Sequence, residues 1–267
     1  MKAKITFQFS LVSLFFLFLI SCEKVEIDTE TQTAQDNSIA EASFMQVFPT
    51  IHAISVNEEG IKKTGSYNTC ATVEIKDTAN FPNSPATITV DYGVDGCSDD
   101  DGKLKKGKLK AVIFDKWANT GAKVVVSFEN YYVNDVKCEG VMTAVNNGNN
   151  SYTITVEDGK CITADFTIGY NSSVTITQFE GAATIEDTDD AFEFTGNANG
   201  TNRDGKTYDS KITTPLIKRN SCKWIEKGIF EVTPQDIAAR TVNYGDGTCD
   251  DDATITINKQ NFQFKLK

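Results

Sequence analysis

Residues 124–129 read VVVSFE, and residues 152–157 read YTITVE. In both stretches every second side chain is apolar, and most of the side chains between them are polar. Successive side chains of a β-strand point to opposite faces of the sheet, so this alternation predicts half-buried antiparallel strands. The same alternation recurs farther along the chain, at Val174 and Ile176, Phe192 and Phe194, Ile255 and Ile257, and Phe262 and Phe264.

Turn dipeptides separate these stretches and supply the positive φ values that tight hairpins require. Examples are Asn147-Gly148, Asp158-Gly159, Asn199-Gly200 and Asp204-Gly205. The pattern predicts an all-β fold of roughly 13–15 short strands with hairpin connections, arranged as an antiparallel sandwich or as stacked sheets. Helical stretches do not alternate with the strands, which argues against a parallel, nucleotide-binding sheet.

The N-terminus has the features of an exported lipoprotein precursor. Lys2 and Lys4 precede an apolar run from Ile5 to Ile20, which is shorter than the 20 or so apolar residues of a spanning helix and suits a secretory signal. The run ends Leu19-Ile20-Ser21-Cys22, which resembles the lipobox of bacterial lipoprotein precursors. The resemblance implies that residues 1–21 are removed and that Cys22 carries acyl chains. The alternative is an uncleaved anchor or an ordinary secretion signal.

Seven cysteines are present, and six remain when Cys22 is set aside for lipidation. Export permits disulfides, and two pairs of cysteines have the same spacing of 27 positions. We predict three local bridges, each stabilising the fold by about 2–4 kcal/mol, namely Cys70–Cys97, Cys138–Cys161 and Cys222–Cys249. No Cys-x-x-Cys pair with neighbouring histidines is present, so a zinc site is not expected.

The chain is acidic, with a formal net charge of −11. Removal of residues 1–21 takes away two of the 26 Lys and Arg residues, so 24 cations and 37 anions leave the mature chain at −13. Phosphate backbones require basic patches, and the charge therefore argues against a nucleic-acid partner.

One short helix is expected before the strands. Residues 22–37 carry few large apolar side chains and are typical of a flexible tether. A helical segment is predicted over residues 38–60, with Asp36, Asn37 and Ser38 as N-cap residues and with Pro49 ending or kinking the helix. His52 lies beside the apolar face, where a histidine is more often packed than catalytic. The β domain then occupies residues 61–267.

Two segments of the chain are similar to each other. Residues 88–102 read ITVDYGVDGCSDDDG, and residues 240–252 read RTVNYGDGTCDDD. Both pass from a strand through Tyr-Gly to an Asp-Gly turn, a cysteine and acidic residues, which indicates weakly repeated units. These motifs, together with FENYYVNDVKCEG from Phe128, resemble a group of uncharacterised Bacteroidota lipoproteins. The resemblance implies a cell-envelope setting and no known activity.

The acidic turns of these segments are candidate calcium ligands. Calcium prefers carboxylate and carbonyl oxygens in loops of this kind. No other cofactor is expected, and the alternative is an ordinary solvated turn, because neither segment has the spacing of an EF-hand. The candidate ligands are Asp95, Asp99, Asp101, Asp246, Asp250 and Asp252.

One modification site is implied by a resemblance. Asp77-Thr78-Ala79 resembles the O-glycosylation motif of exported Bacteroidota proteins. The resemblance makes Thr78 a candidate glycosylation site.

The sequence carries no clear catalytic constellation. A single histidine argues against Ser-His-Asp chemistry, and no phosphate-binding glycine loop precedes a helix. The candidates for a sugar-stacking platform or for the core are Trp117, Tyr131, Tyr132, Tyr170 and Trp224. We therefore expect a non-catalytic lipoprotein at the outer membrane, facing the periplasm or the cell surface, that binds a protein or glycan or supports the envelope. The alternatives are a calcium-dependent adhesion or glycan-binding module and, less favoured, a carboxylate-based hydrolase.

Overall fold

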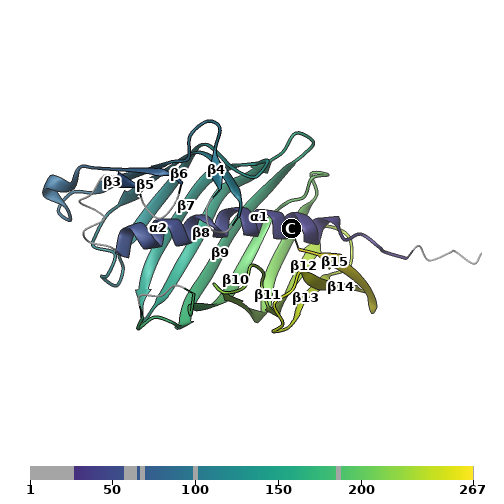
Figure 1. Ribbon diagram of the computed structural model, residues 1–267. Helices are drawn as coiled ribbons and strands as arrows, with labels where there is room; N and C mark the ends of the chain where they lie inside the picture. The colour runs from purple at the N-terminus through teal and green to yellow at the C-terminus, as the bar shows by residue number, and fades with distance from the viewer. Residues whose placement is uncertain (1–26, 57–64, 67–69, 99–101, 185–187, 267) are drawn as a thin grey trace, which may run out of the picture.

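The computed structural model describes residues 27–56, 65–66, 70–98, 102–184 and 188–266. A helical segment at the N-terminus, α1 (Gln32–Met45) and α2 (Val47–Val56), is followed by an antiparallel sheet, as Figure 1 shows. The predicted class, all-β with one N-terminal helical segment, is confirmed. The strands are β1 (Gly65–Ser66), β2 (Thr72–Lys76), β3 (Ala86–Asp91), β4 (Cys97–Ser98), β5 (Leu104–Ile113), β6 (Lys123–Val133), β7 (Val136–Gly148), β8 (Ser151–Ile162), β9 (Thr167–Glu180), β10 (Ala191–Thr201), β11 (Thr207–Arg219), β12 (Lys227–Pro234), β13 (Arg240–Asp246), β14 (Asp252–Ile257) and β15 (Gln260–Lys265).

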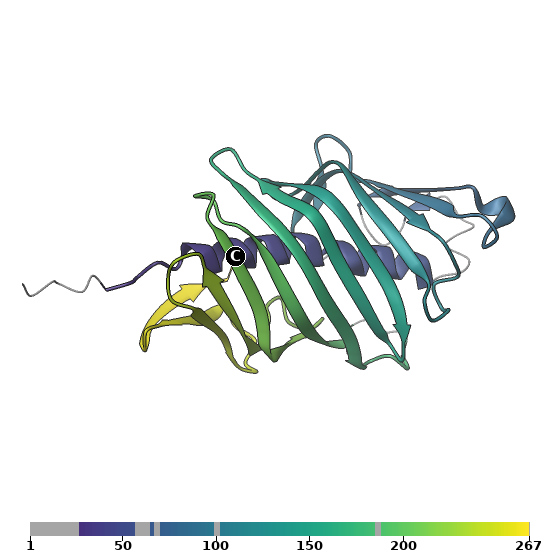
Figure 2. The ribbon, with the colours of Figure 1, turned by 180° about the vertical axis from the view of Figure 1, so that it is seen from behind.

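The strands form one continuous meander. Each pairs antiparallel with the next in the order β1-β2-β3-β5 and on to β15, while β4 pairs with β5 beside this path. The helical segment crosses the strands on one face of the sheet, and the opposite face is seen in Figure 2. The second layer is therefore the helix, around which a single sheet is wrapped, and not a separately hydrogen-bonded sheet.

The helix begins earlier than the sequence predicts. It starts at Gln32, so the segment assigned to the tether is partly helical, and Asp36 and Asn37 lie inside α1 as buried residues and not at its N-cap. Glu30 caps this end, because its Oε1 accepts hydrogen bonds from the backbone and hydroxyl of Thr33 at 2.6 and 3.1 Å. Asp36 and Asn37 therefore have the composition of cap residues but lie buried within the helix, on its contact with the sheet.

Pro49 falls in the first turn of α2, after the helix is interrupted at Gln46. A proline is tolerated in a first turn, since the N–H that it lacks has no partner within the helix there. The predicted end of the helix at Pro49 is not observed, because α2 continues through the proline to Val56.

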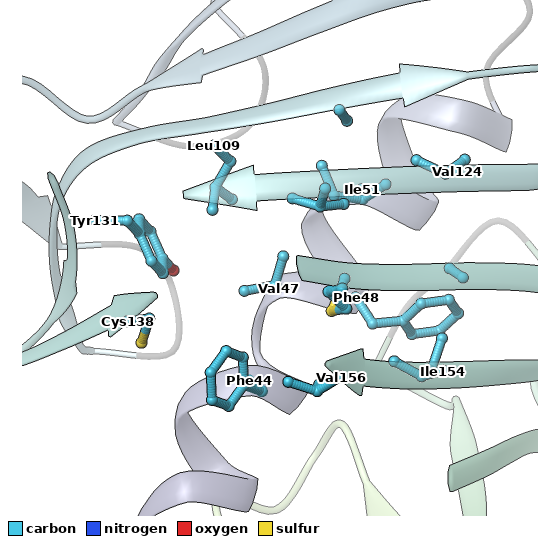
Figure 3. Close-up of a cluster of buried hydrophobic side chains, with 14 of the residues drawn as sticks. Phe44, Val47, Phe48, Ile51, Leu109, Val124, Tyr131, Cys138, Ile154 and Val156 are labelled. Carbon is cyan, nitrogen blue, oxygen red and sulfur yellow. The ribbon is translucent and has the colours of Figure 1, made fainter. Parts of the chain in front are cut away.

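One face of the helix packs into the concave side of the sheet. Phe44, Val47 and Ile51 are almost fully buried there, and Figure 3 shows them pointing toward side chains of β5, β6 and β8. The ring of Phe44 stacks on Tyr170 with a centroid distance of 5.6 Å and meets Phe128 edge-on at the same distance. This contact joins the helix to the middle of the sheet.

Two of the predicted turns are parts of strands. Asp158-Gly159 lies in β8 at a bulge, where Asp158 has a φ of 51°. A Cβ on Gly159 would stand 2.4 Å from the carbonyl oxygen of Tyr170 and 3.1 Å from Cζ of Phe44. Asn199-Gly200 lies within β10, and a Cβ on Gly200 would approach the carbonyl oxygen of Gly169 to 2.0 Å. These glycines permit close approach of neighbouring atoms and do not reverse the chain.

Of the other two predicted turns, Asp204-Gly205 connects β10 to β11 as expected. Asn147-Gly148 ends β7, and the hairpin turns just after it, at Asn149 and Asn150, which have φ values of 52° and 55°. Two successive residues with positive φ match the right-handed twist of the strands that they connect.

Two of the three predicted disulfides are formed. Cys70–Cys97 joins a loop residue to the start of β4, and Cys222–Cys249 joins two loop residues, each with a Cα–Cα distance of 5.7 Å. Cys22 lies outside the described residues.

The third predicted bridge is wrong, because Cys138 and Cys161 are buried free thiols. They are paired across β7 and β8. A hydrogen bond with Cys161 and burial raise the pKa of the Cys138 thiol well above its usual range. A disulfide forms through the thiolate, and the neutral pair instead fills the core as small apolar side chains do.

Two arginines hold the N-terminal end of the helical segment on the sheet. The fully buried Arg240 binds both carboxylate oxygens of Asp28, at 2.7 and 2.8 Å, and the side chain of Glu30 at 3.2 Å. Arg203 binds the fully buried Asp36 through its guanidinium at 2.6 and 3.0 Å and through its backbone N–H at 2.9 Å. These ion pairs fix the position of the N-terminal end of the helical segment relative to β10–β15.

Candidate functional site

A cavity of about 610 Å³ lies along the face of the helix that is not packed in the core. Its walls come from α1 and the start of α2, from β9–β11 and from the end of β15. Pockets that hold small organic ligands typically measure about 300–1,000 Å³. The cavity is therefore large enough for a drug-sized or lipid-sized molecule.

Apolar side chains make up most of the wall. The helix contributes Ile39, Met45 and Phe48. The sheet and the segments beyond it contribute Ile176, Phe192, Phe194, Leu216, Ile225, Phe264 and Leu266. Several of these side chains are only partly buried, since the cavity keeps them from closing on one another. The wall can accommodate an alkyl chain or a ring system.

Glu41 is the acidic residue that α1 contributes to this wall. Burial raises the pKa of its carboxyl to about 7, although part of the side chain remains accessible from the cavity. Among the described residues it makes no hydrogen bond or ion pair. Tyr244 lines the cavity as well, and burial holds the pKa of its hydroxyl above the usual range. Glu41 and Tyr244 therefore form a polar part of the cavity wall, and the protonation of Glu41 decides whether that part is neutral or negative.

His52 also lines the cavity and belongs to a cluster of aromatic rings. Its Nδ1 accepts a hydrogen bond from Nε1 of Trp117 at 3.0 Å, and its ring meets Tyr152 edge-on with a centroid distance of 4.8 Å. Burial lowers the pKa of His52 to about 4. The imidazole is neutral near pH 7 and is packed, as the sequence predicts.

We expect the NMR signals of His52 to titrate near pH 4. Below the unfolded pKa of about 6.5 the unfolded chain takes up a proton that the folded chain does not, so His52 lowers stability as the pH falls from that value toward 4. Since the chain has one histidine, its ring signals are unambiguous. The urea-unfolded chain serves as the control, with an expected midpoint near 6.5. A midpoint near 6.5 in the folded protein would contradict the packing described for this ring.

Of the five residues proposed for a sugar-stacking platform, Trp117, Tyr131 and Tyr170 are in the core, whereas Tyr132 and Trp224 are partly exposed. Trp117 is 2 % exposed and Tyr131 is fully buried. Neither ring offers a face to a ligand from solution. Trp224 is the tryptophan that lines the cavity.

The acidic residues around Cys249 make contacts within the chain. Lys265 binds Asp251 at 2.6 Å and Asp252 at 2.7 Å, and Asp246 accepts hydrogen bonds from the backbone and hydroxyl of Thr248. The carboxylate of Asp250 accepts a hydrogen bond from the backbone of Asp252. Across the described ranges, no group of three or more His, Cys, Asp and Glu side chains is placed to hold a metal ion.

Calcium binding stays a prediction. Asp95 lies in the turn before β4, while Asp99 and Asp101 lie outside the described residues. Thr78 begins a short 3-10 helix, η2 (Thr78–Asn80), and is partly exposed. Its glycosylation also stays a prediction.

Glu41, Arg203 and Arg240 are not among the residues that the sequence analysis indicates as functional. Glu41 could have been noticed, because Met45, Phe48 and His52 follow it on the same side of the helix and leave one acid within an apolar face. No signal of this kind exists for Arg203, which lies 167 positions from its partner Asp36.

Comparison of the chain with protein-family models, with curated proteins and with solved structures finds no match. In the part of the chain that the structure describes, no helix has both the length and the apolar character needed to cross a membrane. The cavity is therefore the feature of the described residues that indicates a function.

Proposed function

We propose that this protein is a non-catalytic binding module that holds a small amphiphilic molecule in the cavity between the helix and the sheet. The observation that carries the proposal is the cavity itself, with a volume of about 610 Å³, a mainly apolar wall and a few polar groups. Binding sites for small molecules have this composition, because apolar contacts supply most of the affinity and a few polar groups orient the ligand.

The N-terminus supports an envelope setting for this activity. A lipidated Cys22 anchors the module to the outer membrane, on the periplasmic or the cell-surface side, and more than one acyl chain is needed for stable anchoring. A site for amphiphiles beside a membrane has lipids and their breakdown products within reach. The two disulfides of the described residues are compatible with an oxidising compartment.

The proposal is tested by titrating the protein with N-phenyl-1-naphthylamine, an uncharged dye that fluoresces in apolar surroundings. The protein carries Cys22→Ser, so that no acyl chain of its own can occupy the cavity. We expect saturable binding of one dye per chain. Ala42 is exposed and lines the cavity, so Ala42→Trp should fill part of the space and weaken binding by at least about tenfold, or 1.4 kcal/mol.

Ala79→Trp is the matched control, since Ala79 is an exposed residue of η2 that does not line the cavity. It should leave the dissociation constant unchanged. Absence of saturable binding, or equal binding by the Ala42→Trp variant, would overturn the proposed function.

A further inference from the structure

A second, much smaller cavity lies behind Glu41. Its volume is about 10 Å³, which is room for roughly one water molecule. Asn37, Tyr170 and Ser210 supply polar atoms to its wall, and Val174 and Phe230 close it with apolar ones. This small cavity is called the inner chamber below. Among the described residues, Glu41 alone lines both the inner chamber and the large cavity, so it lies where the two approach each other.

Two buried polar side chains near Glu41, one of them in the wall of the inner chamber, lack a hydrogen-bond partner among the described residues. Asn37 is 2 % exposed, and its Oδ1 has no hydrogen-bond partner among the described residues. The hydroxyl of Tyr208, close enough for the charge of Glu41 to raise its pKa, is likewise buried without a partner among them. Buried polar atoms in folded proteins are nearly always hydrogen-bonded. A group that brings N–H donors into this place would satisfy Asn37 and Glu41 together.

The charge around Glu41 favours a cation. Burial raises its pKa, and no cation contributes to that pKa. The titratable groups that interact with Glu41 across the interface are Tyr170 on β9, Tyr208 on β11 and Tyr244 on β13, none of which carries a positive charge. An ionised carboxylate in such surroundings is strongly stabilised by a cation that is brought to it.

The cations that line the large cavity have partners elsewhere. Four of them make an ion pair, a hydrogen bond to a carbonyl oxygen or a contact with an aromatic ring, which reduces their attraction for an anionic ligand, and Lys103 also has an interaction partner. These contacts are Arg203 with Asp36, Lys265 with Asp251 and Asp252, Lys218 with the carbonyl of Cys222, and Lys223 with the ring of Trp224.

We propose that the ligand is a long-chain primary amine, with its ammonium in the inner chamber against Glu41 and Asn37 and its alkyl chain along the apolar wall of the large cavity. An ammonium carries three N–H donors and no acceptor, and it is about as large as the water molecule for which the inner chamber has room. A phosphate, a carboxylate or a trimethylammonium group is too large for that space. This assignment rests on the proposed function, since it names the class of ligand for the same cavity.

The experiment compares four ligands with the same ten-carbon chain: decylamine, decanol, decanoate and decyltrimethylammonium. Each displaces the naphthylamine dye from the Cys22→Ser protein at about pH 8, where Glu41 is largely ionised and an alkylamine is protonated. We expect decylamine to bind at least about tenfold more tightly than the other three ligands. Glu41→Gln should remove this advantage, whereas decanol should bind the variant at least as well as it binds the unchanged protein.

Glu157→Gln is the matched control, because Glu157 is an exposed residue of β8 that lines neither cavity. It should leave all four affinities unchanged. Equal binding of decylamine and decanol, or an unchanged decylamine affinity in Glu41→Gln, overturns the amine assignment and leaves the proposed function standing. Failure of all four ligands to displace the dye overturns the amine assignment, and failure of the dye itself to bind overturns the proposed function as well.

Discussion

Replacing Arg203 by methionine is expected to lower the free energy of unfolding by about 3–5 kcal/mol, because it leaves the carboxylate of Asp36 buried without its counter-ion. Asp36 is fully buried, and the guanidinium of Arg203 holds it at 2.6 and 3.0 Å. The guanidinium also lies 3.8 Å from the centre of the Phe166 ring, a contact that methionine replaces only in part. Urea denaturation of the variant and of the unchanged protein measures the difference.

A double-mutant cycle separates the ion pair from the lost packing. Asp36→Asn combined with Arg203→Met removes the uncompensated charge, so the double variant should be more stable than Arg203→Met alone. Lys76→Met is the matched control: its ion pair to Glu74 is 3.0 Å long, and the two side chains are 63 % and 49 % exposed. Surface pairs of this kind contribute about 0–1 kcal/mol. A loss for Arg203→Met no larger than that for Lys76→Met would refute the role given to the Asp36 pair.

Replacing Phe44 by alanine is expected to cost about 3–5 kcal/mol, the usual range for removing a buried aromatic ring. The ring is fully buried and contacts Tyr170, Phe128 and the bulge at Gly159. Its removal leaves a void between α1 and the sheet, which the rigid strands cannot close. The midpoint of thermal or urea unfolding reports the loss.

Phe179→Ala serves as the control, since Phe179 is 47 % exposed and surface substitutions usually change stability by no more than about 0.5 kcal/mol. The same variants should separate in dye binding, because α1 supplies one wall of the cavity. A Phe44→Ala variant as stable as Phe179→Ala would mean that the helix is not held on the sheet through this ring.

One side of the helix packs in the core, and another side lines the cavity. The inner face, with Phe44, Val47 and Ile51, joins the core and fixes the height of the helix above the sheet. The side of the helix that lines the cavity carries Ile39 and Met45 among polar residues such as Gln46, and it lies beside empty space. The arginine contacts keep the helix from shifting into that space, and the cavity persists as a result.

Much of the fold could be predicted from alternation and from cysteine spacing. Stretches such as residues 152–157 have period two because one side of the sheet faces the helix and the other faces solvent, and this pattern is local. The two bridges with equal spacing are also local. The sequence predicts that Cys138 and Cys161 are neighbours, and they are paired across two strands. It does not predict that both are free thiols, because that state depends on burial and on the hydrogen bond between them.

The errors arise where tertiary contacts override a local pattern. Asp158-Gly159 has the composition of a turn, but the chain uses it as a bulge that makes room for Phe44. Asp36 and Asn37 have the composition of a cap, but a contact with Arg203 far along the chain keeps Asp36 within the helix. The cavity could not be predicted at all, because its walls come from segments that are distant in sequence.

A crystal structure of the protein soaked with decanol that carries bromine on its terminal carbon tests directly whether the cavity binds an amphiphile. Anomalous scattering locates the bromine independently of the rest of the ligand, and the hydroxyl head group leaves the amine assignment out of the test. We predict one bromine site within the cavity, with the chain between the helical residues Ile39 and Met45 and the sheet residues Phe192 and Phe194. Bromine bound only outside the cavity, or a cavity filled by the protein's own side chains, would show that the cavity is not the binding site for an amphiphile.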